Sequence, residues 1–408
     1  MKILTDQFIK SVLVLISGSF IGQIVNFISA PIMTRLFTVT DIGVFTYINS
    51  IASIFIPVIC LRYENAIVLE NNNSKVFALI KLCFLINLFF SIIIFLFLSF
   101  YFFYNEIFKY IFMIFLIVFI SGTINILTAF NTREKNFNLL SKLSIYRPIV
   151  NFIFILIFGI FHSSFLGLLF AYILSLIAGI FSQMKDLLKE KSKLIKFSRF
   201  ELKSVGKKYL QFPKYSMPAI FFNNISYLSL NFFISHLYGM DVLGYYSLSY
   251  RVLGVPLTLI SNNIGNVFYE KASKDYYSSG SFKIIFIRTF KLLFLLTLPI
   301  TLVIYFISPW FCSVYFGENW YIAGEYIQLL SLLFGIRFIV SPLTSGILVL
   351  KENRIELMCQ FPFFMVTFAL FLYCKIINLL SVNDFLLFLS IGFSIIYCMF
   401  GYIIYKLS

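Results

Sequence analysis

The sequence is organised around the stretch GSFIGQIVNFISAPIMTRLFTVTDIGVFTY, which runs from Gly18 to Tyr47. Its first part is almost continuously apolar, Arg35 ends that apolar run, and a second apolar run follows a short polar turn. A fainter copy, AIFFNNISYLSLNFFISHLYGMDVLGYYS, occupies 219–247, where Gly244 matches Gly43. Because this offset is close to half of the 408 residues, the pattern indicates a duplicated architecture.

The composition is that of an integral membrane protein. Hydrophobic residues make up 60% of the chain and charged residues only 12%, whereas soluble domains carry about 25% charged residues. The net charge of +15 does not favour nucleic-acid binding, because the Lys and Arg residues lie in short loops between apolar runs. The six cysteines occur singly, so the sequence indicates neither a disulfide framework nor a metal site.

Twelve apolar segments have the length of a membrane-spanning helix, which needs about 20 residues to cross a hydrocarbon core about 30 Å thick. They lie at 11–35, 42–65, 76–104, 108–131, 143–161, 164–184, 212–237, 243–268, 286–308, 325–350, 356–376 and 384–405. The sequence therefore predicts an all-α polytopic membrane protein with an N-terminal six-helix bundle (1–184), a basic cytoplasmic linker (185–211) and a C-terminal six-helix bundle (212–408). Since six is an even number, both bundles enter the membrane in the same orientation, which predicts a pseudo-twofold axis along the membrane normal.

The distribution of basic residues predicts the orientation. Of the 32 Lys and Arg residues, only Arg35, Lys109 and Lys375 fall in predicted outside loops, and three more fall within spans. The remainder lie in loops on one side, which the positive-inside rule assigns to the cytoplasm. Both termini are therefore predicted to lie inside the cell, in a multi-pass membrane protein.

The linker 185–211, KDLLKEKSKLIKFSRFELKSVGKKYLQ, has two interpretations. It could lie on anionic lipid with Phe197, Phe200 and Val205 facing the bilayer. Alternatively, it could dock a cytoplasmic partner. The first interpretation is favoured.

No catalytic constellation is present in the sequence. The two histidines, His162 and His236, have no nucleophile or carboxylate partner at a recognisable spacing, and the serine-hydrolase, zinc-protease and phosphate-loop motifs are absent. We therefore expect a protein that is not an enzyme and that uses no cofactor or metal.

Charged residues inside predicted spans are the first candidates for a binding site, because ionisable groups at membrane depth usually face a cavity or a partner. Arg147, Arg251 and Arg337 lie within spans, and arginine suits phosphate through its forked donors. Arg62 and Glu64, near the inner end of the second span, could instead extend to the membrane interface, or Glu64 could act as a charge partner or coupling residue.

Polar residues on the spans are the second group of candidates. Ser19, Gln23 and Asn26 recur at a spacing that places them on one face of a helix. Similar polar positions occur in later spans, at Asn224, Tyr227, Asn262 and Asn266. Such groups could line a cavity and exchange hydrogen bonds with sugar hydroxyls, or they could hold neighbouring helices together, with Gly18 and Gly22 as a close-packing face. Their presence in both halves favours a cavity lining.

The runs PIMTRLFTVTDIGVFTY (31–47) and LRYENAIVL (61–69) resemble the opening of Wzx-type polysaccharide flippases. These proteins belong to the multidrug/oligosaccharidyl-lipid/polysaccharide exporter (MOP) superfamily. The residues that match the family pattern are Pro31, Arg35, Leu36, Phe37, Asp41, Gly43, Arg62, Glu64, Ala66, Ile67 and Val68.

The resemblance implies a V-shaped pair of six-helix bundles around a central cavity. It also implies a substrate, an undecaprenyl-diphosphate-linked oligosaccharide, that is flipped from the inner to the outer leaflet by alternating access. The pathway would be the biosynthesis of a surface polysaccharide, either the O-antigen of lipopolysaccharide or a capsule, and other polysaccharide assembly proteins would be possible partners.

Three alternatives stay open at this stage. A peptidoglycan-precursor flippase and a drug exporter belong to the same superfamily. A membrane polysaccharide polymerase belongs to a different class, and it would need a large outer loop carrying catalytic groups.

Overall fold

The computed structural model describes residues 2–103, 106–189, 199–350, 353–377 and 380–408. These residues fold into helices joined by short turns, and the described ranges contain no strand. Long apolar segments become helices in a membrane because a helix satisfies its own backbone hydrogen bonds where water is absent. The expectation of an all-helical protein is therefore confirmed.

Seven helices in the described ranges are long and apolar enough to cross a membrane. They are Asn73–Tyr101, Phe108–Arg133, Phe137–Ile160, Ser164–Lys185, Lys283–Phe316, Glu318–Ile347 and Val382–Leu407. The chain is thus a multi-pass membrane protein, while the count of twelve spans stays a prediction.

The chain forms two compact units. Unit 1 comprises Met1–Phe37 and Tyr47–Leu228, and unit 2 comprises Thr38–Thr46 and Ser229–Ser408. The start of one helix, α2 (Val39–Phe55), therefore belongs to unit 2, and the first half of another, α11 (Met217–Tyr238), belongs to unit 1.

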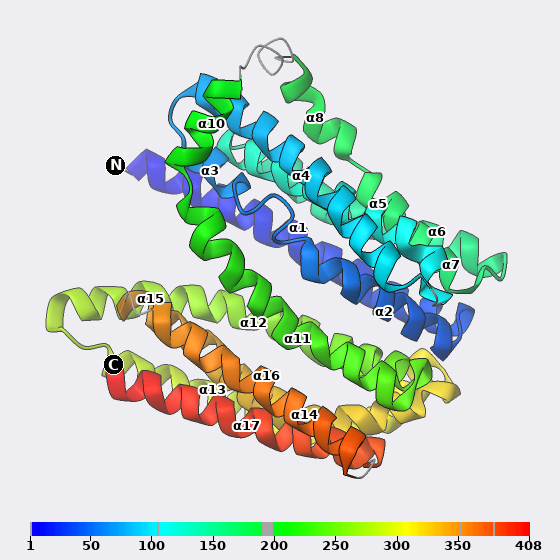
Figure 1. The fold of residues 1–408 in the computed structure, drawn as a ribbon. Helices are drawn as coiled ribbons and strands as arrows, with labels where there is room; N and C mark the ends of the chain where they lie inside the picture. Colours follow the sequence, from blue (N-terminus) through cyan, green and yellow to red (C-terminus); the bar gives the residue numbers. More distant parts are fainter. Residues whose placement is uncertain (1, 104–105, 190–198, 351–352, 378–379) are drawn as a thin grey trace. The chain divides into compact units, whose positions relative to one another are not determined.

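Unit 1 contains the second half of α2, from Tyr47 onward. The rest of unit 1 is a bundle in which α1 lies against α6, α4 against α5, and α6 against α7 (Figure 1). Its other helices have these bounds: α1 Lys2–Leu36, α3 Glu64–Leu69, α4 Asn73–Tyr101, α5 Ile111–Arg133, α6 Phe137–Ile160, α7 Ser164–Ile177, α8 Ile180–Lys189 and α10 Arg199–Lys208.

Unit 2 is built around α14, which packs against α12, α13 and α17. Its helices have these bounds: α12 Met240–Ser279, α13 Lys283–Phe316, α14 Tyr321–Leu343, α15 Ser345–Leu350, α16 Asn353–Ile376 and α17 Val382–Leu407. Gly280, in the left-handed region at φ 73°, ends α12 and allows the sharp turn into α13.

The predicted second span, 42–65, is interrupted in the structure. Helix α2 ends at Phe55, turns follow, and α3 begins at Glu64. Leu61 and Arg62 adopt positive φ angles of 51° and 66°, which are rare for residues with a side chain. The break frees backbone carbonyls, and the Asn125 side chain donates a 3.2 Å hydrogen bond to one of them, that of Ile56.

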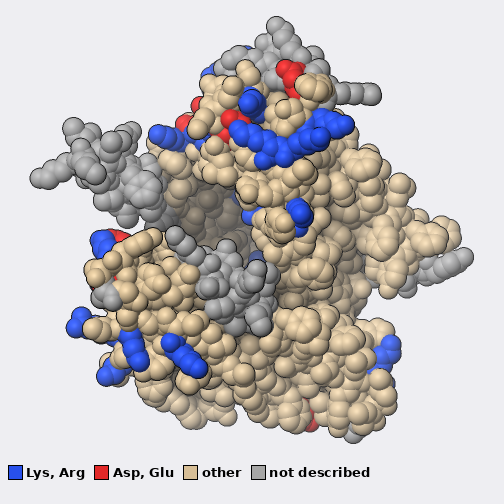
Figure 2. Space-filling view, turned by 60° about the vertical axis from the view of Figure 1, so that its left-hand side comes forward, with Lys and Arg blue, Asp and Glu red and all other residues tan. Residues whose placement is uncertain are grey.

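The basic linker docks on unit 1 through the α3–α4 turn. The Lys208 ammonium lies 2.6 Å from Glu70 Oε2, and the Tyr209 hydroxyl donates to the same oxygen at 3.0 Å. Val205, on the same helix as Lys208, is 4% exposed, so the prediction that it faces the bilayer is wrong. Phe200 is 81% exposed, and Phe197 lies outside the described residues. Charged side chains gather at the end of unit 1 that carries α3 and α10 (Figure 2).

Replacing Glu70 with Gln is expected to loosen this docking. Burial raises the pKa of the Glu70 carboxyl, but hydrogen bonds from the Lys208 ammonium, a backbone N–H and the Tyr209 phenol lower the pKa to about 2. The charged contact should therefore raise stability at any pH above the ordinary carboxyl pKa, and should be lost only as the pH falls towards about 2.

Limited trypsin cleavage after Lys207 and Lys208 measures the docking. We expect E70Q to be cleaved about tenfold faster than the wild type, with the same ratio between about pH 6 and about pH 8. E201Q, a change on the exposed face of α10, is the control. Equal cleavage of E70Q and the wild type would show that the pair does not hold α10.

Candidate functional site

Unit 1 contains an open polar cavity of about 530 Å³ between α1, α5, α6 and α8. About half of its lining surface is polar, and the polar lining residues carry amide, hydroxyl or guanidinium groups: Ser19, Gln23, Asn26, Thr128, Thr132, Ser144, Arg147 and Gln183. The other lining residues are Leu15, Gly22, Leu140, Leu143 and Pro148. No Asp or Glu occurs among these described lining residues, so Arg147 gives the cavity a net positive charge.

Helix α1 forms one wall because two glycines bring it close to α6. A Cβ atom at Gly18 would overlap Ser141, and one at Gly22 would overlap the carbonyl oxygen of Ser144. This close approach places Gln23 and Asn26 on the cavity side of α1, with the Asn26 amide 3.5 Å from Gln23 Oε1. The glycine face therefore joins the helices, while the amide face lines the cavity.

Arg147 on α6 is held in a fixed orientation inside the cavity. Its Nε donates to the carbonyl oxygen of Ala178 at 3.3 Å, and Nη2 donates to Gln183 Oε1 at 3.4 Å. The Ala178 carbonyl is available because the chain breaks between α7 and α8, where Gly179 has a φ of 84°. A guanidinium held in this way is a preorganised donor for an anion.

Gln183, which the sequence interpretation missed, is the second organising residue of the cavity. It is 1% exposed and accepts a hydrogen bond from Arg147. Its Nε2 donates to the Thr128 hydroxyl oxygen at 3.5 Å. Its backbone carbonyl accepts a 3.1 Å hydrogen bond from Asn131. The signal was an amide near the end of the predicted span 164–184, the same kind of signal that identified Gln23.

Replacing Gln183 with Leu is expected to weaken the cavity's hold on an anionic ligand by about tenfold. The change removes an acceptor that orients the Arg147 guanidinium, and hydrogen bonds to charged groups are worth about 1.5–3 kcal/mol. Binding of inorganic diphosphate to the purified chain measures the effect. S182L, one position earlier and exposed, is the matched control. Unchanged affinity in Q183L would show that Arg147 needs no such support.

Four further predicted site residues lie elsewhere in unit 1. Arg62 Nη1 and Glu64 Oε1 are 3.6 Å apart at the break between α2 and α3, where Glu64 is buried. Asn224 on α11 donates to the carbonyl oxygen of Ser53 at 3.4 Å, and Tyr227 is half-buried one turn further along α11. None of these four residues is among the described residues that line the polar cavity.

The remaining predicted residues lie in unit 2. Arg337 on α14 donates to the Tyr250 hydroxyl at 2.9 Å, and its guanidinium lies 5.6 Å from the ring centroid of Phe334. Arg251 and Asn266 are exposed on α12. Asn262 also lies on α12, but its side chain is outside the described part of the structure. Within unit 1, the structure therefore gathers Gln23, Asn26 and Arg147 into one cavity.

Comparison with solved structures identifies the fold. The fold resembles an inward-facing multidrug resistance MATE family transporter of the MOP superfamily, with a TM-score of 0.71 over 95% of each chain at 12% identity. It also resembles a MOP superfamily transporter from Pyrococcus furiosus, with a TM-score of 0.60 over 97% of this chain and 95% of that chain at 14% identity. The fold is that of MOP superfamily transporters.

The chain belongs to a family of polysaccharide biosynthesis proteins, whose profile matches residues 32–324. It is 22% identical over 228 residues to the teichuronic acid biosynthesis protein TuaB of Bacillus subtilis, and 24% identical over 231 residues to an uncharacterized membrane protein in the cps region of Klebsiella pneumoniae. These alignments span 55% and 57% of this chain but only 45% and 47% of the relatives. The resemblance inferred from the sequence is thus confirmed for the polysaccharide biosynthesis family and for the fold.

Proposed function

We propose that the chain is a transporter that flips an undecaprenyl-diphosphate-linked oligosaccharide from the inner to the outer leaflet of the bacterial plasma membrane by alternating access. The observation that carries the proposal is the polar cavity of unit 1, in which a fixed guanidinium lies among amides and hydroxyls. The polysaccharide family and the transporter fold support a substrate of this class.

The chemistry of the cavity suits the polar part of such a substrate. The forked donors of Arg147 match the oxygens of a diphosphate, and the amides of Gln23 and Asn26 can both donate to and accept from sugar hydroxyls. A cation would find a net positive wall and no carboxylate among the described lining residues. The lining therefore favours an anionic glycolipid over the cationic compounds that a drug exporter would carry.

The proposal includes an architecture and a pathway. Twelve spans, with both termini inside, would form two bundles of six at 1–184 and 212–408, joined by the linker 185–211. Arg62, Arg251 and Arg337 would be further contacts for the anion, Glu64 a charge partner, and Asn224, Tyr227, Asn262 and Asn266 further polar lining. The named function of TuaB and the cps region of the second relative support a role in surface polysaccharide assembly, either capsule or O-antigen.

Reconstitution tests the transport function. Proteoliposomes carrying the purified chain and a lipid-linked oligosaccharide confined to the inner leaflet would be exposed to a lectin that cannot cross the membrane. We expect the lectin-accessible fraction to rise with time relative to protein-free liposomes. No rise above the protein-free rate would refute transport of this substrate.

The same vesicles distinguish a transporter from a polymerase. Mass spectrometry of the recovered glycan should show an unchanged number of sugar residues while the lipid-linked oligosaccharide becomes accessible. Glycans longer than the starting oligosaccharide would instead identify the chain as a polymerase.

A further inference from the structure

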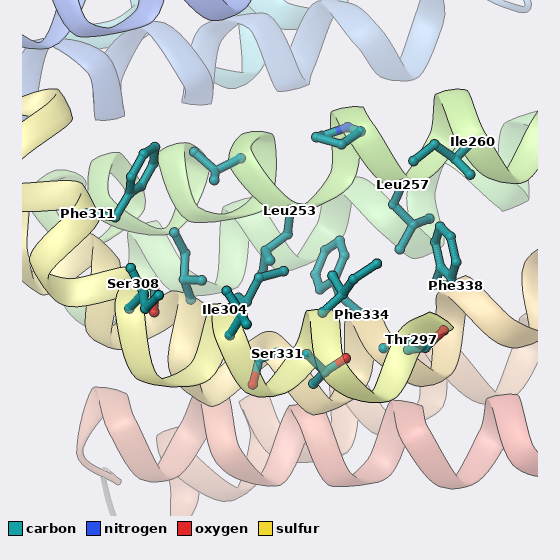
Figure 3. Close-up of a pocket in the computed structure, with 18 residues that line it drawn as sticks. Leu253, Leu257, Ile260, Thr297, Ile304, Ser308, Phe311, Ser331, Phe334 and Phe338 are labelled. Atoms are coloured by element: carbon teal, nitrogen blue, oxygen red, sulfur yellow. The ribbon is translucent and has the colours of Figure 1, made fainter. Parts of the chain in front are cut away.

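We propose that an apolar pocket in unit 2 binds the polyprenyl chain of an anionic lipid carrier. The pocket has a volume of about 320 Å³ and lies between α12, α13 and α14 (Figure 3). This volume is at the lower end of the range for small-molecule sites. The inference rests on the proposed function, because that function names a polyprenyl-linked substrate.

The lining of this pocket excludes a polar occupant. Of its 18 residues, four carry a hydroxyl and none carries a charge. Three of the four hydroxyls already donate to backbone carbonyls, from Thr297 to Leu293 at 2.6 Å, from Ser308 to Gly324 at 3.1 Å and from Ser331 to Gln328 at 2.7 Å. A sugar or phosphate placed here would lose its hydrogen bonds to water without replacement, which is costly. A hydrocarbon chain would lose nothing.

The pocket borders the hydrocarbon phase of the membrane. Helix α13, which forms one wall, is long and apolar enough to span the bilayer. Its large apolar side chains are exposed over most of its length, including Leu295, Leu302 and Phe306. A chain that already lies among lipid tails therefore has access to the pocket without passing through water.

A positive charge at the edge of the pocket selects an anionic lipid. Phe334, whose ring lines the pocket in Figure 3, also lies beneath the Arg337 guanidinium, 5.6 Å from its ring centroid. The Tyr250 hydroxyl, which accepts from Arg337 at 2.9 Å, and the edge-on contact of the Tyr250 and Phe334 rings fix this arrangement. A phosphate near Arg337 and an apolar chain in the pocket would satisfy both parts of the site, as a polyprenyl phosphate does.

Filling the pocket tests the inference. S331F places an aromatic ring in the apolar pocket, because Ser331 is buried and lines that pocket. The Ser331 hydroxyl donates to a carbonyl of its own helix, so the change breaks no hydrogen bond to another helix. L332F places the same ring on the outer side of α14, where Leu332 is 53% exposed. Native mass spectrometry of the full chain in nanodiscs should show undecaprenyl phosphate bound at least about tenfold more weakly by S331F than by L332F or the wild type.

Two results would overturn the inference. The first is that S331F binds undecaprenyl phosphate as strongly as L332F does. The second is that S331F loses dioleoyl phosphatidylglycerol binding to the same extent as undecaprenyl phosphate binding, which would show that the pocket holds any lipid chain. The failure of the proposed function is distinguishable, since binding of inorganic diphosphate in the polar cavity of unit 1 does not use Ser331 and can be measured separately in S331F.

Photolabelling tests the same inference on the wild-type chain, so the result does not depend on whether a variant folds. A photoreactive undecaprenyl phosphate should label peptides from α12 or α14 that carry pocket residues such as Leu257 and Phe338. Labelling confined to the exposed outer face of α13 would overturn the proposal.

Discussion

Replacing Gly43 or Gly244 with Ala is expected to destabilise the protein by about 1–3 kcal/mol for each change. A Cβ atom at Gly43 would overlap the carbonyl oxygen of Met240, and one at Gly244 would overlap the carbonyl oxygen of Val39. Both obstacles are backbone atoms at the crossing of α2 and α12 within unit 2, so no side chain can rotate away to relieve them.

Thermal unfolding of the detergent-solubilised chain measures this effect. G254A is the matched control, because Gly254 is also buried on α12 but a Cβ atom there would be 3.5 Å from its nearest neighbour, an ordinary contact. We expect G43A and G244A to unfold at lower temperature than G254A. Equal unfolding temperatures for the three variants would show that the crossing is looser than described.

Replacing Arg147 with Ala is expected to reduce surface polysaccharide to about a tenth of the wild-type level or less. The change removes the positive charge from the polar cavity and leaves the Ala178 carbonyl and Gln183 without their donor. R147K should retain an intermediate level, because lysine keeps the charge but not the forked geometry.

Cells in which the chain is the sole transporter of its kind provide the measurement, with membrane abundance checked for each variant. K142A is the matched control, since Lys142 lies on the same helix but is exposed. Wild-type polysaccharide in R147A at normal abundance would remove Arg147 from the mechanism.

The repeat in the sequence predicted a duplicated architecture, but it did not predict that the two copies contact each other. The offset that matches Gly43 with Gly244 also relates Val39 to Met240 and Thr40 to Asp241. In the structure the two copies are in contact. Gly43 approaches Met240, and Gly244 approaches Val39. The Thr40 hydroxyl donates to Asp241. Such reciprocity is the pattern of an isologous contact. Sequence alone showed two similar stretches and could not show that they touch.

Short-range periodicity was informative for the candidate site. The spacing of Gln23 and Asn26 placed them on one helix face, and the cost of a charge in a span identified Arg147. The cavity also depends on Gln183, whose contact with Arg147 arises from a helix break at Gly179 and a separation of 36 residues. No helical period encodes a contact of that range.

The remaining differences also have local physical causes. The break after Phe55 requires positive φ at Leu61 and Arg62, residue types that rarely adopt it, so the sequence gives no warning of the turn. The docking of the linker depends on Lys208 and Glu70, which are 138 residues apart. The apolar pattern of the linker was therefore open to a lipid-facing interpretation, whereas in the structure Val205 is buried on the helix that this ion pair holds against unit 1.

Binding of undecaprenyl diphosphate to the full chain in nanodiscs tests the central claim most directly, because it isolates recognition of the anionic head group from transport. The account predicts that R147A binds this lipid at least about tenfold more weakly than the wild type, whereas K142A binds as the wild type does. Equal affinity of R147A and K142A would contradict the claim that the polar cavity of unit 1 is the site of substrate recognition.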